Sequence, residues 1–155
     1  MSRRTISLKI NGEDRRVEIE DNTLLLDMLR DRLGLKAARD GCSVGACGSC
    51  TVLLNGNPIS SCLKLASTLP EGAEISTAEG LADGERLDPV QEAFLEEGAF
   101  QCAFCTSGMM LAVKALLAEN STPTDEEAKA YLNGHYCRCG SYPEILKAVR
   151  RLSGP

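Results

Sequence analysis

Two halves of the chain differ in the spacing of their apolar residues. In the first half, apolar and polar residues alternate in short stretches, which is the two-residue period of a half-buried β-strand. The predicted strands cover residues 5–10, 15–19, 51–54, 59–62 and 74–77. Asn11-Gly12 and Asn55-Gly56 lie between consecutive strands, and both residues of such a pair tolerate the positive φ of a tight hairpin turn. The first half is therefore predicted to form a sheet.

One helix interrupts the predicted strands. Leucines and a methionine recur at helical spacing from Leu24 to Leu33. Asn22 or Thr23 is a candidate N-cap for this helix, and Gly34 is a candidate residue for its end. The arrangement predicted for the first half is a sheet with one helix across it and a loop of cysteines at its edge.

Beyond residue 80 the strand pattern disappears and the apolar spacing becomes helical. The predicted helices run from Asp88 to Gly98, from Met109 to Glu119, from Thr124 to about Gly134, and from Ser141 through Val149. Pro89 stands at the first helical position, which proline favours. Thr124 and Ser141 each begin a capping box that ends in Glu three residues later. The second half is predicted to be a small bundle of about four helices.

The whole chain sets further limits. Its 155 residues suffice for one or two domains, and we predict an α+β fold with domains at 1–80 and 81–155. The net charge of −5 and the lack of a long Lys/Arg run argue against nucleic acid as a partner. No apolar stretch reaches the roughly 18 residues that a membrane span needs. Ser2-Arg3-Arg4 precedes alternating and charged residues instead of the apolar core of an export signal, so a cytoplasmic location is expected.

Eight cysteines fall into two sets of four, called here the first and the second quartet. The first is Cys42, Cys47, Cys50 and Cys62 (C-x₄-C-x₂-C-x₁₁-C), and the second is Cys102, Cys105, Cys137 and Cys139 (C-x₂-C-x₃₁-C-x-C). A [2Fe–2S] cluster takes four thiolates, and the first pattern has plant-type ferredoxin spacing, so electron transfer is the leading hypothesis. Zinc and a disulfide framework are the alternatives. They are disfavoured because three ligands in one glycine-rich loop suit a bulkier centre and because no secretion signal is present.

The surroundings of both quartets suit a negatively charged cluster. Gly41, Gly45 and Gly48 surround the first three cysteines, and glycine allows backbone N–H groups to approach and point toward sulfur. The cysteines of the second quartet lie just before two predicted helices, whose N-termini favour negative charge. Arg138, between two of these cysteines, either offsets charge or is an ordinary surface cation.

Three segments carry a resemblance to a known family. They are GCSVGACGSCTV at 41–52, QCAFCTSG at 101–108 and CRC at 137–139. With both quartets in this order, the chain resembles the small iron–sulfur subunit of the xanthine oxidase family of molybdenum hydroxylases, from about residue 5 to residue 151. Carbon monoxide dehydrogenase, aldehyde oxidoreductases and nicotinate or quinoline-type dehydrogenases have such subunits.

The resemblance implies a plant-ferredoxin-like β-grasp domain followed by a four-helix [2Fe–2S]-binding domain. It implies that the first quartet holds the cluster nearer a flavin and the second the cluster nearer molybdopterin, with Gln101 and Cys139 beside the pterin. Such a chain makes no substrate bonds itself but relays single electrons from molybdopterin, in its cytosine dinucleotide form, to FAD or another acceptor. The resemblance places molybdopterin on a large partner subunit and FAD on a medium one, in a dimer of heterotrimers.

The chain departs from the family pattern at several positions beside the second quartet. His135-Tyr136 precede Cys137 where relatives commonly have Asn, and Gly140 follows Cys139 where they have Thr. His135 is the sole histidine and is expected not to be a ligand, since eight thiols suffice for two clusters. A free-standing ferredoxin, a subunit of a succinate dehydrogenase-type assembly and a zinc-stabilised interaction module are the rival hypotheses. Nothing in the sequence selects the substrate of the complex or the direction of electron flow.

Overall fold

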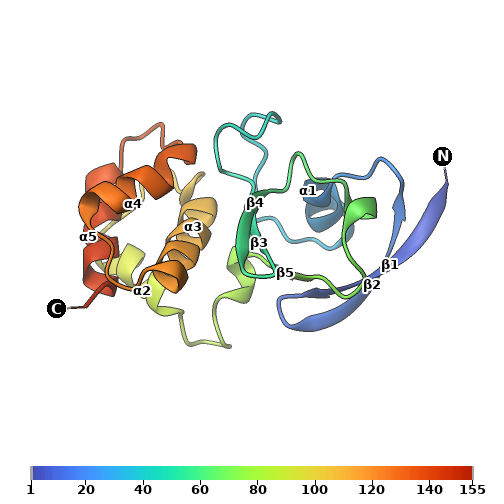
Figure 1. Ribbon diagram of the computed structural model, residues 1–155, viewed down its shortest axis with the longest axis horizontal. Coiled ribbons are helices and arrows are strands. Elements are labelled where there is room, and N and C mark those ends of the chain that lie inside the picture. The colour runs from blue at the N-terminus through green and yellow to red at the C-terminus, as the bar shows by residue number, and fades with distance from the viewer. Residues whose placement is uncertain (1, 155) are drawn as a thin grey trace.

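The computed structural model describes residues 2–154, with a sheet half and a helical half side by side (Figure 1). The strands are β1 (Arg3–Ile10), β2 (Glu13–Glu20), β3 (Thr51–Leu54), β4 (Asn57–Ser60) and β5 (Glu74–Ser76). They form one sheet in the order β2-β1-β5-β3-β4, in which β1 and β5 are parallel and the other neighbours antiparallel. The predicted α+β class is confirmed.

Both predicted hairpin turns are present. Asn11 and Gly12 have φ values of 51° and 83°, and Asn55 and Gly56 have 49° and 82°. Positive φ at both central positions gives the turn the twist that antiparallel strands need. The five strands lie within a few residues of their predicted positions, and the last of these turns leads into β4 two residues earlier than expected.

The helix predicted from Leu24 to Leu33 is wrong in kind. The segment forms a three-residue helix, α1 (Leu25–Asp27), which continues as a π-helix, η1 (Met28–Arg32). No side chain caps its N-terminus, because the hydroxyl of Thr23 instead accepts a hydrogen bond from the N–H of Glu20, at 3.0 Å. The hydroxyl of Thr23, an expected N-cap, is therefore bonded to the last residue of β2 and is not available to α1. The predicted role of the segment is kept, since its apolar side chains enter the core beneath the sheet.

The core of the sheet half contains two of the predicted ligands. Side chains from β1, β2, α1 and η1 pack with Cys50 and Cys62. The largest fully buried members are Ile19, Leu25, Met28, Leu29, Val52 and Ile75. Two thiols of the first quartet are thus fixed by the same apolar packing that holds the sheet against α1 and η1.

The helical half contains α2 (Pro89–Glu96), α3 (Thr106–Glu119), α4 (Asp125–Tyr131) and α5 (Tyr142–Leu152). Short 3₁₀ turns lie between the longer elements of both halves. They are η2 (Ala66–Thr68) in the sheet half, η3 (Ala78–Gly80) between the halves and η4 (Leu132–Gly134) in the helical half. Asp88 caps α2 with the expected geometry, and Gly98 beyond its end has a φ of +60°. The helix predicted from Met109 to Glu119 begins at Thr106, three residues before the expected start. Cys105 is therefore its N-cap residue.

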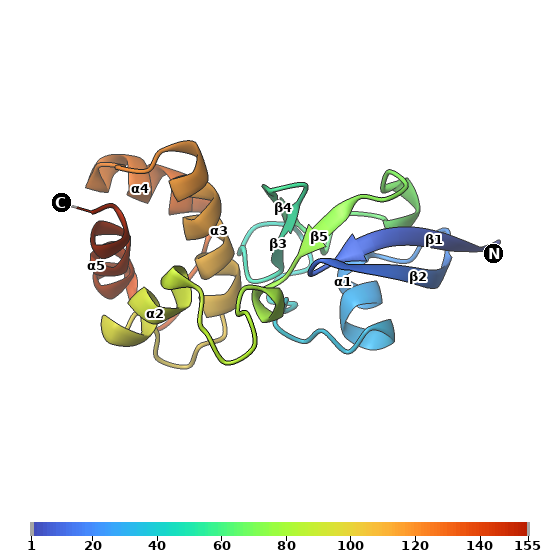
Figure 2. The ribbon, with the colours of Figure 1, turned by 90° about the horizontal axis from the view of Figure 1, so that it is seen from below.

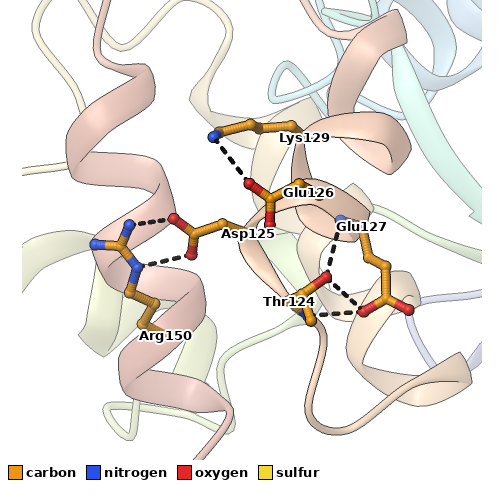
Figure 3. Close-up of polar contacts among 6 residues, drawn as sticks. All are labelled: Thr124, Asp125, Glu126, Glu127, Lys129 and Arg150. Carbon is orange, nitrogen blue, oxygen red and sulfur yellow. Dashed lines mark hydrogen bonds and ion pairs between the residues drawn. The ribbon is translucent and has the colours of Figure 1, made fainter.

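One of the two predicted capping boxes is confirmed and the other is wrong. The Thr124 hydroxyl accepts a hydrogen bond from the N–H of Glu127, whose carboxylate accepts one from the N–H of Thr124 (Figure 3). Figure 3 also shows the bidentate pair between Asp125 of α4 and Arg150 of α5. Ser141 makes no such bond, because its ψ of 18° is not the extended conformation of an N-cap.

The two halves meet where α3 packs against β3, an arrangement visible in both views of the ribbon (Figures 1 and 2). Leu53 of β3 and Leu111 and Ala115 of α3 form a small buried cluster, against which Tyr131 packs. We call this contact region the seam. Within residues 2–154, no helix combines the length and the apolar character that crossing a membrane would require.

Candidate metal centres

Three cysteines of the first quartet lie in the loop between η1 and β3, and the fourth lies in the turn directly after β4. The loop is closed by a hydrogen bond from the N–H of Arg39 to the carbonyl of Ser49, at 3.0 Å. The N–H and the hydroxyl of Ser61 both donate to the carbonyl of Cys50, at 3.4 and 2.7 Å. Because Cys62 is the next residue, these bonds bring the fourth cysteine to the other three.

The thiols of the first quartet act on one another. Hydrogen bonds from backbone N–H groups, first that of Val44, and from the thiol of Cys47 lower the pKa of Cys42 to about 7. Burial raises the pKa of Cys62 to about 11, and the neighbouring thiol of Cys50 and the charge at Cys42 add to this. These pairwise contacts connect all four members of the first quartet.

The three predicted loop glycines have separate structural reasons. Gly41 has an ordinary φ, but a Cβ there would lie 2.9 Å from the sulfur of Cys47. Gly45 has a φ of +70°, and its N–H donates to the sulfur of Cys62. Gly48 has a φ of +72°, and a Cβ there would collide with the helical half. Close approach and positive φ are both demands that glycine meets without strain.

The second quartet lies where two helices begin, as the sequence predicts. Cys102 opens the short turn that leads to Cys105, the N-cap residue of α3. Cys137 and Cys139 lie in the turn before α5. The first residue of α5, Tyr142, holds this turn, because its hydroxyl accepts a hydrogen bond from the N–H of Cys137 at 2.7 Å.

The thiols of the second quartet are also linked in pairs. A hydrogen bond from the N–H of Phe104, followed by one from the thiol of Cys139, lowers the pKa of Cys102. Burial raises the pKa of Cys105 to about 12, and the thiol and charge of Cys137 reinforce the shift. The contacts that shift these pKa values run within the second quartet and join all four of its members.

The donors around the second quartet fit an anionic group. Burial acts to raise the pKa of Cys137, but hydrogen bonds led by the N–H of Ser141, 3.4 Å from the sulfur, outweigh burial and lower it. The hydroxyl oxygens of Thr106 and Ser141 are buried, and within residues 2–154 they have no hydrogen-bond partner of good geometry. The nearest acceptor for the hydroxyl of Ser141 is the sulfur of Cys137, whose pKa it helps to lower. Such unpaired hydroxyls are costly, and thiolate and inorganic sulfide would accept their protons. The donor set therefore fits [2Fe–2S] clusters.

All eight cysteines are free thiols in the structure. Among the residues from 2 to 154, no three His, Cys, Asp or Glu side chains are placed to hold a single metal ion. The division of the thiols into two groups rests on the pairwise contacts described above. It coincides with the two quartets that the spacing predicts.

The two residues predicted to lie beside a pterin are neighbours at the surface. The side-chain amide of Gln101 donates to the backbone carbonyl of Cys139, at 3.2 Å. Gln101 is exposed and Cys139 is half-buried. Arg138, the adjacent residue, is exposed, as an ordinary surface cation would be.

Two side chains join the two cysteine loops through contacts that the sequence does not predict. Arg39 donates to the carbonyl of Ala103 at 2.6 Å, and its guanidinium lies 5.4 Å from the ring centroid of Phe104. The hydroxyl of Ser107 donates to the carbonyl of Ala37, at 2.5 Å. No spacing in the sequence signals these pairs, because their partners are far apart in the chain.

His135, the only histidine, also lies between the two halves. Its Nε2 is 2.9 Å from the hydroxyl of Thr51 in β3, and burial lowers the pKa of the imidazole. His135 was expected to lie outside the ligand sets, but its contact with Thr51 could not be predicted from the sequence.

Models of two protein families match successive parts of the chain. The "2Fe-2S iron-sulfur cluster binding domain" matches residues 8–82, and the "[2Fe-2S] binding domain" matches residues 77–150. Each match contains one complete quartet. The two matches meet around η3, where the sheet half passes into the helical half.

Known proteins resemble the chain over nearly its whole length. It is 47% identical to the nicotinate dehydrogenase small FeS subunit of Eubacterium barkeri, over 97% of this chain and 95% of that protein. It is 40% identical to the aldehyde oxidoreductase iron–sulfur-binding subunit of Escherichia coli K12, over 96% of this chain and 71% of that protein. A chain in the crystal structure of quinoline 2-oxidoreductase from Pseudomonas putida 86 superposes with a TM-score of 0.93 at 41% identity, covering 97% of this chain and 93% of that one.

Proposed function

The chain belongs to the iron–sulfur subunits of the xanthine oxidase family, and on that premise we propose that each thiol quartet holds one [2Fe–2S] cluster. The chain is the electron-transfer subunit of a larger molybdenum-containing oxidoreductase. A [2Fe–2S] cluster supplies the chemistry, since it accepts and gives up one electron at a time. The protein supplies the ligands, the N–H donors and the spacing between the two centres.

One observation carries the assignment of ligands. Within each quartet the thiols shift one another's pKa, although up to thirty-one residues separate consecutive members in the chain. In the first quartet the N–H groups of the loop point toward sulfur, and in the second the N–H groups before α5 do so. Such hydrogen bonds stabilise thiolate and raise the reduction potential of a cluster that the thiolates hold.

The finer description of the fold is part of the proposal. The mixed five-stranded sheet with α1 and η1 across one face supports a β-grasp domain of plant-ferredoxin type. The four helices α2 to α5 support a separate [2Fe–2S]-binding domain. We place the boundary between 1–80 and 81–155; residues 1 and 155 themselves lie outside the described part of the chain.

The two centres have different expected neighbours. Gln101 and Cys139 adjoin one another at the surface of the helical half, and we propose that this surface faces the pterin of the large partner subunit. The amide of Gln101 bonded to the Cys139 carbonyl gives a short path from that surface to a ligand of the second quartet. The first quartet is then the exit toward the acceptor.

The chain is a small subunit that works with a large molybdenum-carrying subunit, as its relatives do. We further propose that this partner holds molybdopterin cytosine dinucleotide, that a medium subunit holds FAD, and that the assembly is a dimer of heterotrimers. We place it in the cytoplasm, where cysteines stay reduced and available to iron.

The purified complex and three variants test these assignments together. We expect about four irons and four acid-labile sulfides per chain in the parent. Cys47→Ser should abolish one of two electron paramagnetic resonance signals, and Cys105→Ser the other, so that each variant is the control for its counterpart. Gln101→Ala should keep both signals and slow the reduction of the clusters by substrate.

Three results would contradict the proposal in different places. Zinc without sulfide in the parent complex would exclude the clusters. Loss of both signals from either serine variant would show that the quartets are not independent. Unchanged reduction kinetics in Gln101→Ala would remove this residue from the pterin side and leave the two clusters intact.

A further inference from the structure

The imidazole of His135 packs against the loop of the first quartet. On one side its Nε2 lies 2.9 Å from the hydroxyl of Thr51, the residue that follows Cys50. On the other side the ring covers Gly48, because a Cβ built on this glycine would lie 2.5 Å from the Cδ2 atom of His135. The absence of a side chain at Gly48 thus makes room for the histidine.

The residues next to His135 form a direct link between the quartets. The N–H of Tyr136 donates to the carbonyl of Cys47, at 2.8 Å. Cys47 belongs to the first quartet, and the residue after Tyr136 is Cys137 of the second. One hydrogen bond and one intervening residue therefore separate a predicted ligand of one centre from a predicted ligand of the other. The hydroxyl of Tyr142 fixes the same turn from behind, since it donates to the carbonyl of His135 at 3.3 Å and accepts from Cys137.

The other polar links between the cysteine loops are longer. One runs from Arg39 to Ala103, so a path through it crosses a whole arginine side chain and the residues between Arg39 and Cys42. The second runs from Ser107 to Ala37, which lies five residues before Cys42. Electrons tunnel more readily along short runs of covalent and hydrogen bonds than along long runs or across space. The bond between Cys47 and Tyr136 is therefore the better path.

The imidazole is held there at a cost. Its Nδ1 is buried and has no hydrogen-bond partner within residues 2–154. A neutral imidazole has one donor and one acceptor nitrogen, and a buried unpaired N–H is rarer than an unpaired acceptor. We therefore place the proton on Nε2, where it is donated to Thr51, and leave Nδ1 as the unpaired acceptor.

We propose that His135 is a positioning residue that holds the hydrogen bond between Tyr136 and Cys47, and that this bond is the path by which an electron passes between the two centres. The inference rests on the proposed function, that each quartet holds a cluster. No covalent bond forms or breaks and no proton moves: one centre loses one electron and the other gains it. His135 acts through Tyr136 and touches neither substrate nor sulfur.

The test uses the intact complex with its clusters. His135→Leu fills the space but cannot hydrogen-bond, Thr51→Val removes the partner hydroxyl, and His135→Gln can still reach that hydroxyl. Thr5→Val, on the exposed surface of β1, is the matched control for Thr51→Val. Three quantities are measured: the signals of both reduced clusters and their magnetic interaction, the rate of electron exchange between the clusters after photoreduction, and hydrogen exchange at the N–H of Tyr136.

We expect both cluster signals to remain in every variant. In His135→Leu and Thr51→Val, electron exchange should slow by roughly tenfold, the lower end of what losing a partner behind a metal ligand usually costs. Hydrogen exchange at Tyr136 should accelerate in the same two variants. The double variant should be no slower than the slower single one, His135→Gln should recover most of the rate, and Thr5→Val should match the parent.

Parent-like electron exchange in Thr51→Val, with faster hydrogen exchange at Tyr136, would overturn the path. Parent-like hydrogen exchange in both Thr51→Val and His135→Leu would overturn the positioning role. If His135→Leu loses a cluster, the electron-exchange and hydrogen-exchange rates of Thr51→Val and His135→Gln test the proposal by the same criteria. An iron-free parent complex would instead contradict the proposed function, so the two failures are distinguishable.

Discussion

In the sheet half, three of the four cysteines lie in a loop with little regular structure, whereas in the helical half all four lie at the beginnings of helices. The loop takes its shape from backbone conformation, with positive φ at Ser43, Gly45 and Gly48. The turns of the second quartet also have positive φ, at Ala103 and Gly140, but they lead directly into α3 and α5, and Cys137 is buried in the same cluster as Met109 of α3 and Ile145 of α5.

The difference indicates where each centre is vulnerable. A helix held along its length by a core moves as a unit, so a local change at one end is opposed by every buried residue behind it. A loop has fewer buried contacts and yields more easily. A disturbance at the seam should therefore distort the first quartet before the second.

Gly108→Ala is the strongest test of this difference. Gly108 lies in the first turn of α3, and a Cβ there would come within 2.1 Å of the carbonyl oxygen of Gly48. The added Cβ would be fixed to the helix backbone and would meet a backbone oxygen, so no side-chain rotation could relieve the contact. Although alanine favours a helix over glycine by up to about 1 kcal/mol, we expect a net destabilisation of about 3 kcal/mol, the upper end for overpacking. Urea unfolding measures it.

The cluster signals of the same variant decide which half gives way. We expect the signal of the first quartet to change or disappear and that of the second to persist. Gly134→Ala is the matched control, because its Cβ would meet nothing within 4 Å and its φ is not positive. Loss of the second signal with retention of the first would reverse the comparison.

A smaller effect separates two helices that look alike in sequence. Thr124→Ala removes the capping bond of α4 and should cost about 1 kcal/mol of stability. Ser141→Ala removes no cap, so we expect almost no loss of helix stability. If the buried hydroxyl of Ser141 donates to the cluster of the second quartet, its removal should instead lower the reduction potential of that cluster. Thermal unfolding and a redox titration monitored by paramagnetic resonance measure the two outcomes. A larger stability loss for Ser141→Ala than for Thr124→Ala would contradict both assignments.

These two capping motifs also show how far local sequence signals reach. Both begin with a hydroxyl residue and have Glu three positions later, but only Thr124 has the extended backbone that an N-cap needs. Ser141 has its N–H directed at Cys137, and this contact fixes its conformation. Thr23 does not cap α1 for a similar reason, since its hydroxyl is bonded to the N–H of Glu20 in β2. Tertiary partners override a local motif at each of these positions.

The strands, the hairpin turns and the grouping of the cysteines were predictable because each depends on nearby residues or on spacing. The seam was not, because its contacts join residues far apart in the chain, such as Arg39 with Ala103. Gly108 gave no signal either, because the predicted helix begins one residue later, at Met109. Only the structure places this glycine in the first turn of α3, where it approaches the carbonyl of Gly48.

The smallest expected effect is the titration of Tyr131 at high pH, which tests whether the seam stays closed there. Tyr131 lies at the end of α4, where it packs against the seam cluster and donates its hydroxyl proton to Glu119 at 2.9 Å. Burial, followed by the hydrogen bond to Glu119 and its charge, raises the pKa of Tyr131 to about 12. An unfolded tyrosine has a pKa of about 10. The folded protein therefore holds this proton more tightly than the unfolded chain does.

The sign of the pH dependence follows from this difference. The stability that Tyr131 contributes is fully present below about pH 10, and it declines as the pH rises toward 12, because the unfolded chain loses the proton first. The difference in tyrosinate absorbance between the parent and Tyr131→Phe isolates this one titration. Glu119→Gln should lower the pKa of Tyr131 only in part, since burial is the larger cause and stays in place. A transition near pH 10 in a protein that is still folded would mean that Tyr131 is exposed to water, and that the helical half does not rest on the sheet half at this point.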